Sequence, residues 1–248
     1  MAAVYDTIGR SYAVTRQPDP RIARAIREAL GEVGTVLNVG AGTGSYEPTE
    51  LRVVAVEPSL QMLRQRPAEA APAVQAVVEC LPFRDTAFDA TLAVLTMHHW
   101  QDRAAGLTEL RRVAWQRVVI LTWDPACRDA FWLTTQYVPE IVDFDVPRFP
   151  PLAELAQYLG PIEARPLSIP HDCQDGFLGA FWRRPEAYLD PHVRRAMSGF
   201  TQLDPQIIQA GLTRLAEDLR SGHWDEQFGW LRHQTSLDLG YRLIIAQK

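Results

Sequence analysis

The chain has 248 residues, of which 47% are hydrophobic and 22% charged, so it can bury a substantial core. Its formal net charge of −5, without any block of Lys or Arg, gives no electrostatic footprint for nucleic acid or an anionic membrane and favours a small-molecule substrate. The amino terminus lacks a signal-peptide pattern, no apolar run could span a membrane, and the 3 cysteines are scattered, so we expect a cytoplasmic protein without a cysteine-based zinc site.

The first predicted elements are a helix and a strand that ends in a glycine-rich turn. Asp19-Pro20 marks the start of the helix, because aspartate can cap the first turn and proline fits within it. Apolar residues then recur at helical spacing as far as Val33. An apolar strand follows at 36–39 and leads directly into Gly40, Gly42 and Gly44. These glycines permit a sharp turn and the close approach of a ligand.

A second apolar strand, Val53 to Val56, ends in Glu57, an acid well placed to accept hydrogen bonds from ribose hydroxyls. Only residues 45–52 separate the glycines from this strand, and Pro48 among them would stop a helix. A nicotinamide dehydrogenase would need a dinucleotide unit of about 30 residues and an acid about 20 residues downstream. The short crossover therefore argues against that class of enzyme.

The following segments continue the alternation of strands and helices. We predict strands over 74–78, 88–95 and 118–123, and a helix capped by Asp102 between the last two. The strand over 88–95 is apolar throughout, as expected of a parallel strand buried on both faces. Its carboxyl end, Thr96-Met97-His98-His99-Trp100, is where chemistry is expected. The alternation predicts a parallel sheet with helices on both faces.

Four stretches of this half are distinctive together: V-L-N-V-G-A-G-T-G, V-V-A-V-E-P-S, E-C-L-P-F-R-D-T-A-F-D-A and H-H-W. They resemble the class I S-adenosylmethionine (SAM) dependent methyltransferases, in particular the small-molecule group called type 11. The match covers roughly Tyr5 to Pro125. The resemblance implies an enzyme with SAM as its cofactor and an α/β, Rossmann-like fold. Its seven-stranded sheet would be mostly parallel, with helices on both faces.

The resemblance also implies which residues bind SAM. The glycine loop would hold the methionine portion, Glu57 the ribose, and the turn at 79–83 would lie under the adenine. The amino-terminal segment would fold over the cofactor. The cofactor-binding candidates are Tyr5, Tyr12, Asn38, Gly40, Ala41, Gly42, Gly44, Glu57, Pro58, Met62, Glu79, Cys80, Leu81 and Thr96. The alternatives are packing on the sheet edge for the two tyrosines, core packing for Met62 and a local backbone contact for Glu79.

Two positions depart from the family pattern. The family usually has Asp or Glu where this chain has Asn38, and often an acid where it has Val77. The amide oxygen of Asn38 can still contact the SAM amino group. Without an acid at position 77, however, adenine depends on backbone and apolar contacts.

Two histidines are candidate catalytic residues. His98 is the first choice for a base, since the resemblance places it near the sulfonium and an unperturbed imidazole has a pKa of about 6.5. The alternative for His98 is a ring that bonds backbone and packs. His171 lies in I-P-H-D-C-Q-D-G-F, which combines a histidine, two carboxylates and a thiol. His171 or Asp172 could bind substrate there, and plain turn chemistry is the alternative. We expect no metal site, because adjacent side chains point in different directions.

The sequence of the second half of the chain predicts a helical cap added to the methyltransferase fold. Residues 126–170 read as a wall on the acceptor side and a sixth strand over 163–169, residues 171–238 as a helical cap, and residues 239–248 as a seventh, antiparallel strand. In a minimal methyltransferase only a short hairpin joins the last two strands. The inserted helices therefore predict a cap over the acceptor site, in a single domain of residues 1–248 in which residues 1–125 bind SAM.

The leading hypothesis is transfer of the SAM methyl group to O, N or C of a small metabolite, with neither nucleic acid nor a membrane as partner. The alternative is a protein that binds SAM or S-adenosylhomocysteine, has lost transfer activity and serves as a partner or sensor. Asn38 and Val77 make this conceivable because both remove polar anchors for the cofactor. An aromatic-lined cavity under the cap would favour the enzyme, and a filled one the binding protein.

Overall fold

The computed structural model describes residues 16–195 and 197–248, and it is built around a sheet of seven strands in the order β3-β2-β1-β4-β5-β9-β6. Neighbouring strands are parallel, except that β9 is antiparallel to both β5 and β6. The strands are β1 (Thr35–Val39), β2 (Arg52–Val56), β3 (Ala73–Val74), β4 (Phe88–Val94), β5 (Ala114–Trp123), β6 (Ile162–Pro166) and β9 (Tyr241–Gln247). This confirms the predicted α/β fold with a mostly parallel sheet.

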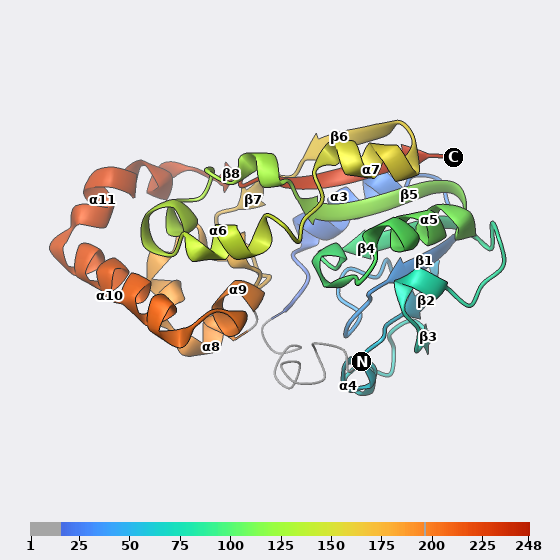
Figure 1. The fold of residues 1–248 in the computed structure, drawn as a ribbon, viewed down its shortest axis with the longest axis horizontal. Helices are drawn as coiled ribbons and strands as arrows, with labels where there is room; N and C mark the ends of the chain where they lie inside the picture. Colours follow the sequence, from blue (N-terminus) through green and yellow to red (C-terminus); the bar gives the residue numbers. More distant parts are fainter. Residues whose placement is uncertain (1–15, 196) are drawn as a thin grey trace.

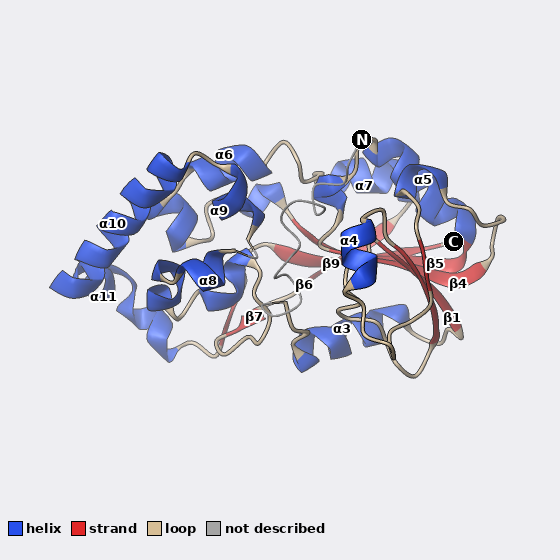
Figure 2. Cartoon of the chain, turned by 90° about the horizontal axis from the view of Figure 1, so that it is seen from below, coloured by secondary structure: helices blue, strands red, loops and turns tan. Residues whose placement is uncertain are grey.

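Helices cover both faces of the sheet (Figure 2). On one face lies α3 (Pro20–Leu30), capped by Asp19 as predicted, and its apolar residues share a cluster with Val36 of β1. On the other face lie α5 (Arg103–Val113) and α7 (Leu152–Leu159), whose apolar residues share a second cluster with Leu37 of β1. Successive side chains of a strand point to opposite faces, so each strand supplies both clusters.

The chain after β5 builds a helical cap beside the sheet (Figure 1). The wall segment contributes η5 (Leu133–Tyr137) and α6 (Glu140–Asp145), which pack against α10 (Pro205–Ser221) and α9 (Ser198–Gln202) of the cap, respectively. A short ribbon of β7 (Ile169–Pro170) and β8 (Ser236–Leu237) closes the base of the cap. The remaining cap elements are η6 (Leu178–Phe181), η7 (Pro185–Leu189), α8 (Pro191–Arg194), α11 (His223–Phe228) and η8 (Gly229–His233). The predicted insertion of helices before the last strand is therefore confirmed.

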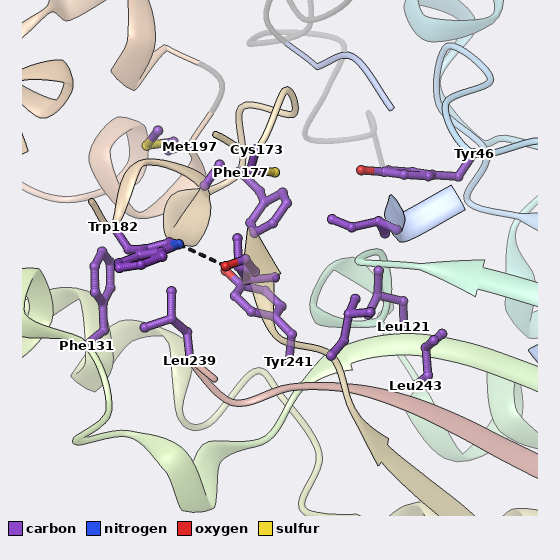
Figure 3. Packing of buried hydrophobic residues seen from close by; sticks show 14 of the residues in the cluster. Tyr46, Leu121, Phe131, Cys173, Phe177, Trp182, Met197, Leu239, Tyr241 and Leu243 are labelled. Carbon is purple, nitrogen blue, oxygen red and sulfur yellow. Dashed lines mark hydrogen bonds between the residues drawn. The ribbon is translucent and has the colours of Figure 1, made fainter. Parts of the chain in front are cut away.

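One hydrophobic cluster runs from the sheet into the cap (Figure 3). The ring of Phe177 packs against Tyr241 of β9 with 4.9 Å between the centroids. Deeper in the cap, Trp182 is fully buried and its indole nitrogen donates to the carbonyl of Ile169 at 3.0 Å. In Figure 3, Leu121 and Leu243 continue the cluster on the side of the sheet. The cap and one face of the sheet thus share their core.

The predicted third and sixth strands are too long, and the predicted fifth strand, over 118–123, is too short because β5 already begins at Ala114. The third strand, predicted over 74–78, is β3 with only two residues, because its neighbour β2 ends at Val56, the partner of Val74. Beyond it, Val78 begins the 3-10 helix η2 (Val78–Cys80). The sixth strand, predicted over 163–169, ends at Pro166, because β9 begins at Tyr241 and pairs no further. Ile169 belongs to the cap ribbon instead.

The short elements near the carboxyl ends of the strands are α4 (Leu60–Arg64), η3 (Met97–His99) and η4 (Pro125–Cys127). Ser59 caps α4 as predicted, since its hydroxyl accepts the amide of Met62 at 3.2 Å. None of the helices among the described residues combines the length and the apolar character that crossing a membrane requires.

Candidate active site

The turn after β1 is shaped by glycines in left-handed backbone conformations. The φ angles of Gly40, Gly42 and Gly44 are +68°, +54° and +99°. A Cβ atom on Gly40 would overlap the side chain of Thr96, which follows β4. The amides of Gly40 and Ala41 both donate to the last carbonyl of β2, at 2.8 and 3.0 Å. Only glycine allows the loop to lie this close to the ends of two neighbouring strands.

Glu57 connects this loop to α4. The side chain is 5% exposed, and its two oxygens accept the amides of Gly42 and Ser59, each at 2.8 Å. Met62 lies beneath the same loop, with its methyl carbon 3.3 Å from where a Cβ on Gly42 would be. Pro58, between these residues, accepts a hydrogen bond from Gln75 through its carbonyl at 3.1 Å. The acid after β2 thus fixes the shape of the loop.

A buried ion pair supports the loop from behind, and the sequence did not predict it. One guanidinium nitrogen of Arg66 contacts both oxygens of Glu47 at 2.8 and 2.9 Å, and the two side chains are 6% and 7% exposed. Another nitrogen of Arg66 donates to the carbonyl of Gly42 at 3.2 Å. The amide nitrogen of Asn38 donates to Glu47 at 3.3 Å. An acid at position 38 would face the Glu47 carboxylate, which gives a physical reason for the amide.

Two pockets meet at the carboxyl end of β4. The smaller one lies on the glycine loop and is lined by Arg16, Asn38, Gly40, Ala41, Gly42, Thr43, Ser45, Tyr46 and Val94. The larger one is partly open to solvent and lies between β4 and the cap. Arg16 lines both, and the consecutive residues Val94 and Leu95 line one each. Leu95 has a φ of +48°, a strained conformation of the kind that clusters at functional sites.

The larger pocket has aromatic walls. Its aromatic lining residues are Trp123, Phe131, Phe149, Phe177 and Tyr241, drawn from β5, the wall segment, the cap and β9. His98, from the end of β4, also lines it, and the His98 ring stacks on Phe149 with 4.5 Å between the centroids. The structure therefore brings His98 to a cavity and leaves the space under the cap open.

The pKa values of two side chains that line this cavity, His98 and Asp145, bear on its chemistry. Burial, together with the positive charges of Arg148 and Arg16 and the neighbouring His99, holds the pKa of His98 well below its usual value, so the ring is neutral at pH 7. Burial raises the pKa of Asp145 to about 6, although the positive Arg148 works against the shift. Neither His98 Nδ1 nor Asp145 Oδ1 has a hydrogen-bond partner among the described residues.

The stretch 171–175 joins the cap to the glycine loop. Asp175, 1% exposed, accepts hydrogen bonds from Arg16 at 2.6 Å and from the hydroxyl of Tyr46 at 2.9 Å. Asp172 pairs with Arg21 at 2.6 Å. His171 lies outside both pockets, with its Nδ1 3.2 Å from the carbonyl of Thr235 in the turn before β8. The structure thus brings Asp175 to the wall of the site, but not His171.

The remaining predicted cofactor residues divide into three cases. Glu79 accepts the amides of Gln101 and Asp102 at 2.8 and 3.3 Å, the local backbone contact given as its alternative. Cys80 is exposed and Leu81 is buried against α5. Tyr5 and Tyr12 lie outside the described residues. Within residues 16–195 and 197–248 there is no group of three His, Cys, Asp or Glu side chains that could hold a metal ion.

Sequence reasoning missed three residues that build the site, namely Tyr46, Arg66 and Asp145. Tyr46 follows the glycine loop directly, and its aromatic ring in a polar turn was a usable signal. Arg66 and Asp145 carry no such signal, because their partners and surroundings come from distant segments.

This chain is similar to known methyltransferases in sequence and in fold. A family model described as a methyltransferase domain matches residues 37–120. A solved structure assigned as a methyltransferase from an antibiotic biosynthesis pathway of Anabaena variabilis is 33% identical, covers 93% of this chain and 98% of its own, and superimposes with a TM-score of 0.86. Among curated protein sequences, none matches the chain.

Two more distant structures share the fold. A SAM-dependent methyltransferase from Thermotoga maritima is 16% identical over 100% of both chains, with a TM-score of 0.59. The [4+2]-cyclase SpnF is 13% identical over 98% of this chain and 94% of its own, with a TM-score of 0.57. At these identities the likeness concerns the fold alone.

Proposed function

Because the chain belongs to the class I SAM-dependent methyltransferases, we propose that it transfers the methyl group of SAM to an oxygen, nitrogen or carbon atom of a small metabolite held under its cap. The observation that carries the proposal is the meeting of the glycine-loop pocket and the aromatic cavity at Val94 and Leu95. Bound SAM supplies a methyl group that its positively charged sulfur makes electrophilic. The net charge of −5 supports a small-molecule acceptor.

The residues around the glycine loop fit this cofactor. Gly40 and Gly42 leave bare backbone where the methionine portion would lie. The amide oxygen of Asn38 would accept a hydrogen bond from its amino group. Glu57 would bind the ribose, since its carboxylate lies at the end of β2 beside the glycine loop and carboxylate oxygens accept hydrogen bonds from hydroxyls. Met62 would offer an apolar contact to the adenine.

The cavity under the cap supports an enzyme rather than a binding protein without activity. It is open and lined by aromatic rings, so it can enclose an acceptor, align it with the end of β4 and exclude water. His98 would contact the acceptor as a neutral imidazole. His171, outside the cavity, would have a structural role in the cap.

Calorimetric titration of the protein with SAM, S-adenosylhomocysteine and NADH tests the cofactor site. We expect micromolar binding of the two adenosyl compounds and none of NADH. Gly40→Ala should weaken S-adenosylhomocysteine binding by roughly tenfold or more, because the new Cβ meets Thr96 at a φ of +68°. Gly222→Ala is the matched control. Its φ is +88°, but nothing lies within 4 Å of its Cβ position, so binding should persist.

The absence of adenosyl binding to the unmodified protein would overturn the proposal. Transfer itself is measured as production of S-adenosylhomocysteine with a panel of hydroxyl, amine and carbon acceptors. This second measurement is necessary because the fold is shared with a cyclase, so fold and cofactor binding alone do not prove methyl transfer.

A further inference from the structure

We propose that the methyl acceptor has an aromatic ring system and carries no acidic group. Its hydroxyl or amino group donates a hydrogen bond to Asp145, next to His98. The inference rests on the proposed function, since it names the chemical class of the acceptor in the same cavity. It is carried by two buried polar atoms of the cavity that have no partner among the described residues, by the charges around them and by the aromatic walls.

The hydrogen bonding of Asp145 and His98 is incomplete. Asp145 Oδ1 and His98 Nδ1 are shielded from solvent and have no partner within residues 16–195 and 197–248. Buried polar atoms without partners cost free energy and usually mark a place where a ligand completes the bonding. An ionised carboxylate only accepts hydrogen bonds, so the missing group at Asp145 must be a donor.

Three other polar side chains of the cavity already have hydrogen-bond partners in the protein. The hydroxyl of Thr134 donates to the carbonyl of Phe131 at 3.1 Å. The hydroxyl of Tyr241 accepts the amide of Gly179 at 3.2 Å, and the sulfur of Cys127 accepts a hydrogen bond from Arg242 at 3.1 Å.

Asp145 and His98 lie on the same wall of the cavity. Phe149 stacks on the His98 ring, and its amide donates to the backbone carbonyl of Asp145 at 3.1 Å. Both residues are therefore linked to Phe149, and both line the same cavity.

The charge inside the cavity disfavours an acidic acceptor. Among the described residues, Arg16, Arg128 and Asp145 are the charged ones that line it, and Arg16, on the side of the glycine loop, is matched by Asp175 at 2.6 Å. Arg128 has a side chain that is 57% exposed, so solvent screens it. Asp145 forms no ion pair with any described residue, and the nearby guanidinium of Arg148 lies over the ring of Phe144 at 4.3 Å. A carboxylate or phosphate of the acceptor placed beside Asp145 would be repelled by its negative charge.

The remaining wall of the cavity is built from pairs of aromatic rings. The rings of Trp123 and Phe149 pack edge to face with 5.5 Å between the centroids. Phe177 and Tyr241 form a similar pair at 4.9 Å. Aromatic walls of this kind favour a planar, apolar ligand body, while a small number of polar groups fix its orientation.

The test uses three probes of one shape, 2-naphthol, 2-methoxynaphthalene and 2-naphthoate, bound to the protein saturated with S-adenosylhomocysteine and measured by ligand-observed NMR. 2-Naphthol should bind at least about tenfold more tightly than 2-methoxynaphthalene, because a hydrogen bond to a charged group is worth about 1.5 to 3 kcal/mol. 2-Naphthoate should bind most weakly. Asp145→Leu should make naphthol and methoxynaphthalene bind equally.

Asp143→Leu is the matched control, because Asp143 is an exposed acid on the same helix and does not line the cavity, so the preference for naphthol should remain. Asp145→Asn provides a second variant of nearly unchanged shape and should reduce the preference severalfold. Titration of every variant with S-adenosylhomocysteine verifies that the cofactor site is intact.

Three results would overturn the inference: equal affinity for naphthol and methoxynaphthalene in the unmodified protein, tightest binding of naphthoate, or no binding of any probe. A preference for naphthol that survives in both Asp145 variants would overturn it as well. Failure of the unmodified protein to bind S-adenosylhomocysteine is a different result, which removes the proposed function itself.

Discussion

The charge of Asp145 lowers the stability of the fold. Burial raises the pKa of this carboxyl to about 6, from an ordinary value near 3.8. The folded state therefore binds the proton more tightly than the unfolded chain does. The free energy of unfolding falls as the pH rises from about 4 to about 6 and stays at the lower level above that range. A buried charge kept at this expense is typical of a functional site.

Replacing Asp145 by Asn should therefore stabilise the protein at pH 7.5. We expect the free energy of unfolding to rise by about 1 to 3 kcal/mol, since one pKa unit corresponds to about 1.4 kcal/mol. The gain should vanish near pH 4, where the native carboxyl is protonated in both states. Urea unfolding at the two pH values measures it, with Asp143→Asn as the control. A variant less stable than the parent at pH 7.5, or equally stabilised at both pH values, would contradict this expectation.

The connection between β1 and β2 shows how a short element can be made rigid without a helix. As Pro48 predicted, no helix forms between the two strands. Side chains stabilise the loop instead. Glu57 accepts the amide of Gly42, and Arg66, which is paired with Glu47, donates to the carbonyl of Gly42. The backbone conformation of the glycine loop thus depends on residues as far along the chain as Arg66, 24 positions after Gly42.

Arg66→Met should damage this loop. The change leaves the Glu47 carboxylate buried without its partner and removes a donor from the carbonyl of Gly42. Loss of one partner of a buried pair costs about 3 to 5 kcal/mol. Arg27→Met breaks the exposed pair with Glu50, whose side chains are 34% and 54% exposed, and should cost below about 1 kcal/mol. Unfolding in urea and titration with S-adenosylhomocysteine check both, and similar losses in the two variants would refute the role of Arg66.

The elements that the sequence predicted well are those determined by local signals. Asp19, Ser59 and Asp102 cap the helices predicted for them, because a cap depends on neighbours within one turn. The ends of β3 and β6 were wrong because a strand extends only as far as its partner. The glycine loop and His98 were predicted from their place in the motif, and both line pockets at the end of β4. Asp145 could not be found, since its burial arises from the packing of the wall segment against the cap and sheet.

At the scale of the whole molecule, the cap and the sheet are joined by one hydrophobic cluster and one polar network. The cluster contains residues of α3, β5 and β9 together with the cap residues Trp182 and Trp224. The network runs from Arg16 through Asp175 to Tyr46, and from Tyr46 to the amide of Asp19 at 3.2 Å. Both features favour cooperative unfolding of the chain as a single domain.

We therefore expect unfolding transitions in urea to coincide when they are followed by far-ultraviolet circular dichroism and by tryptophan fluorescence. The dichroism reports sheet and helices together. The fluorescence is weighted toward the wall segment and the cap, where Trp132, Trp182 and Trp224 are buried. Two separate midpoints would mean that the cap unfolds on its own, and the single domain over residues 1–248 would have to be divided.

The position of β9 also bears on the way the protein is made. β9 hydrogen-bonds β5 on one side and β6 on the other, yet the whole cap separates it from β6 along the chain. The ribosome therefore completes β5, a strand of 10 residues, long before it synthesises β9, the neighbour of β5 in the sheet. Until then the nascent chain presents an open strand edge to other molecules in the cell, which is the usual starting point of aggregation. Slow translation of the cap would prolong this exposure, and a chaperone that covers the edge of β5 would shorten it.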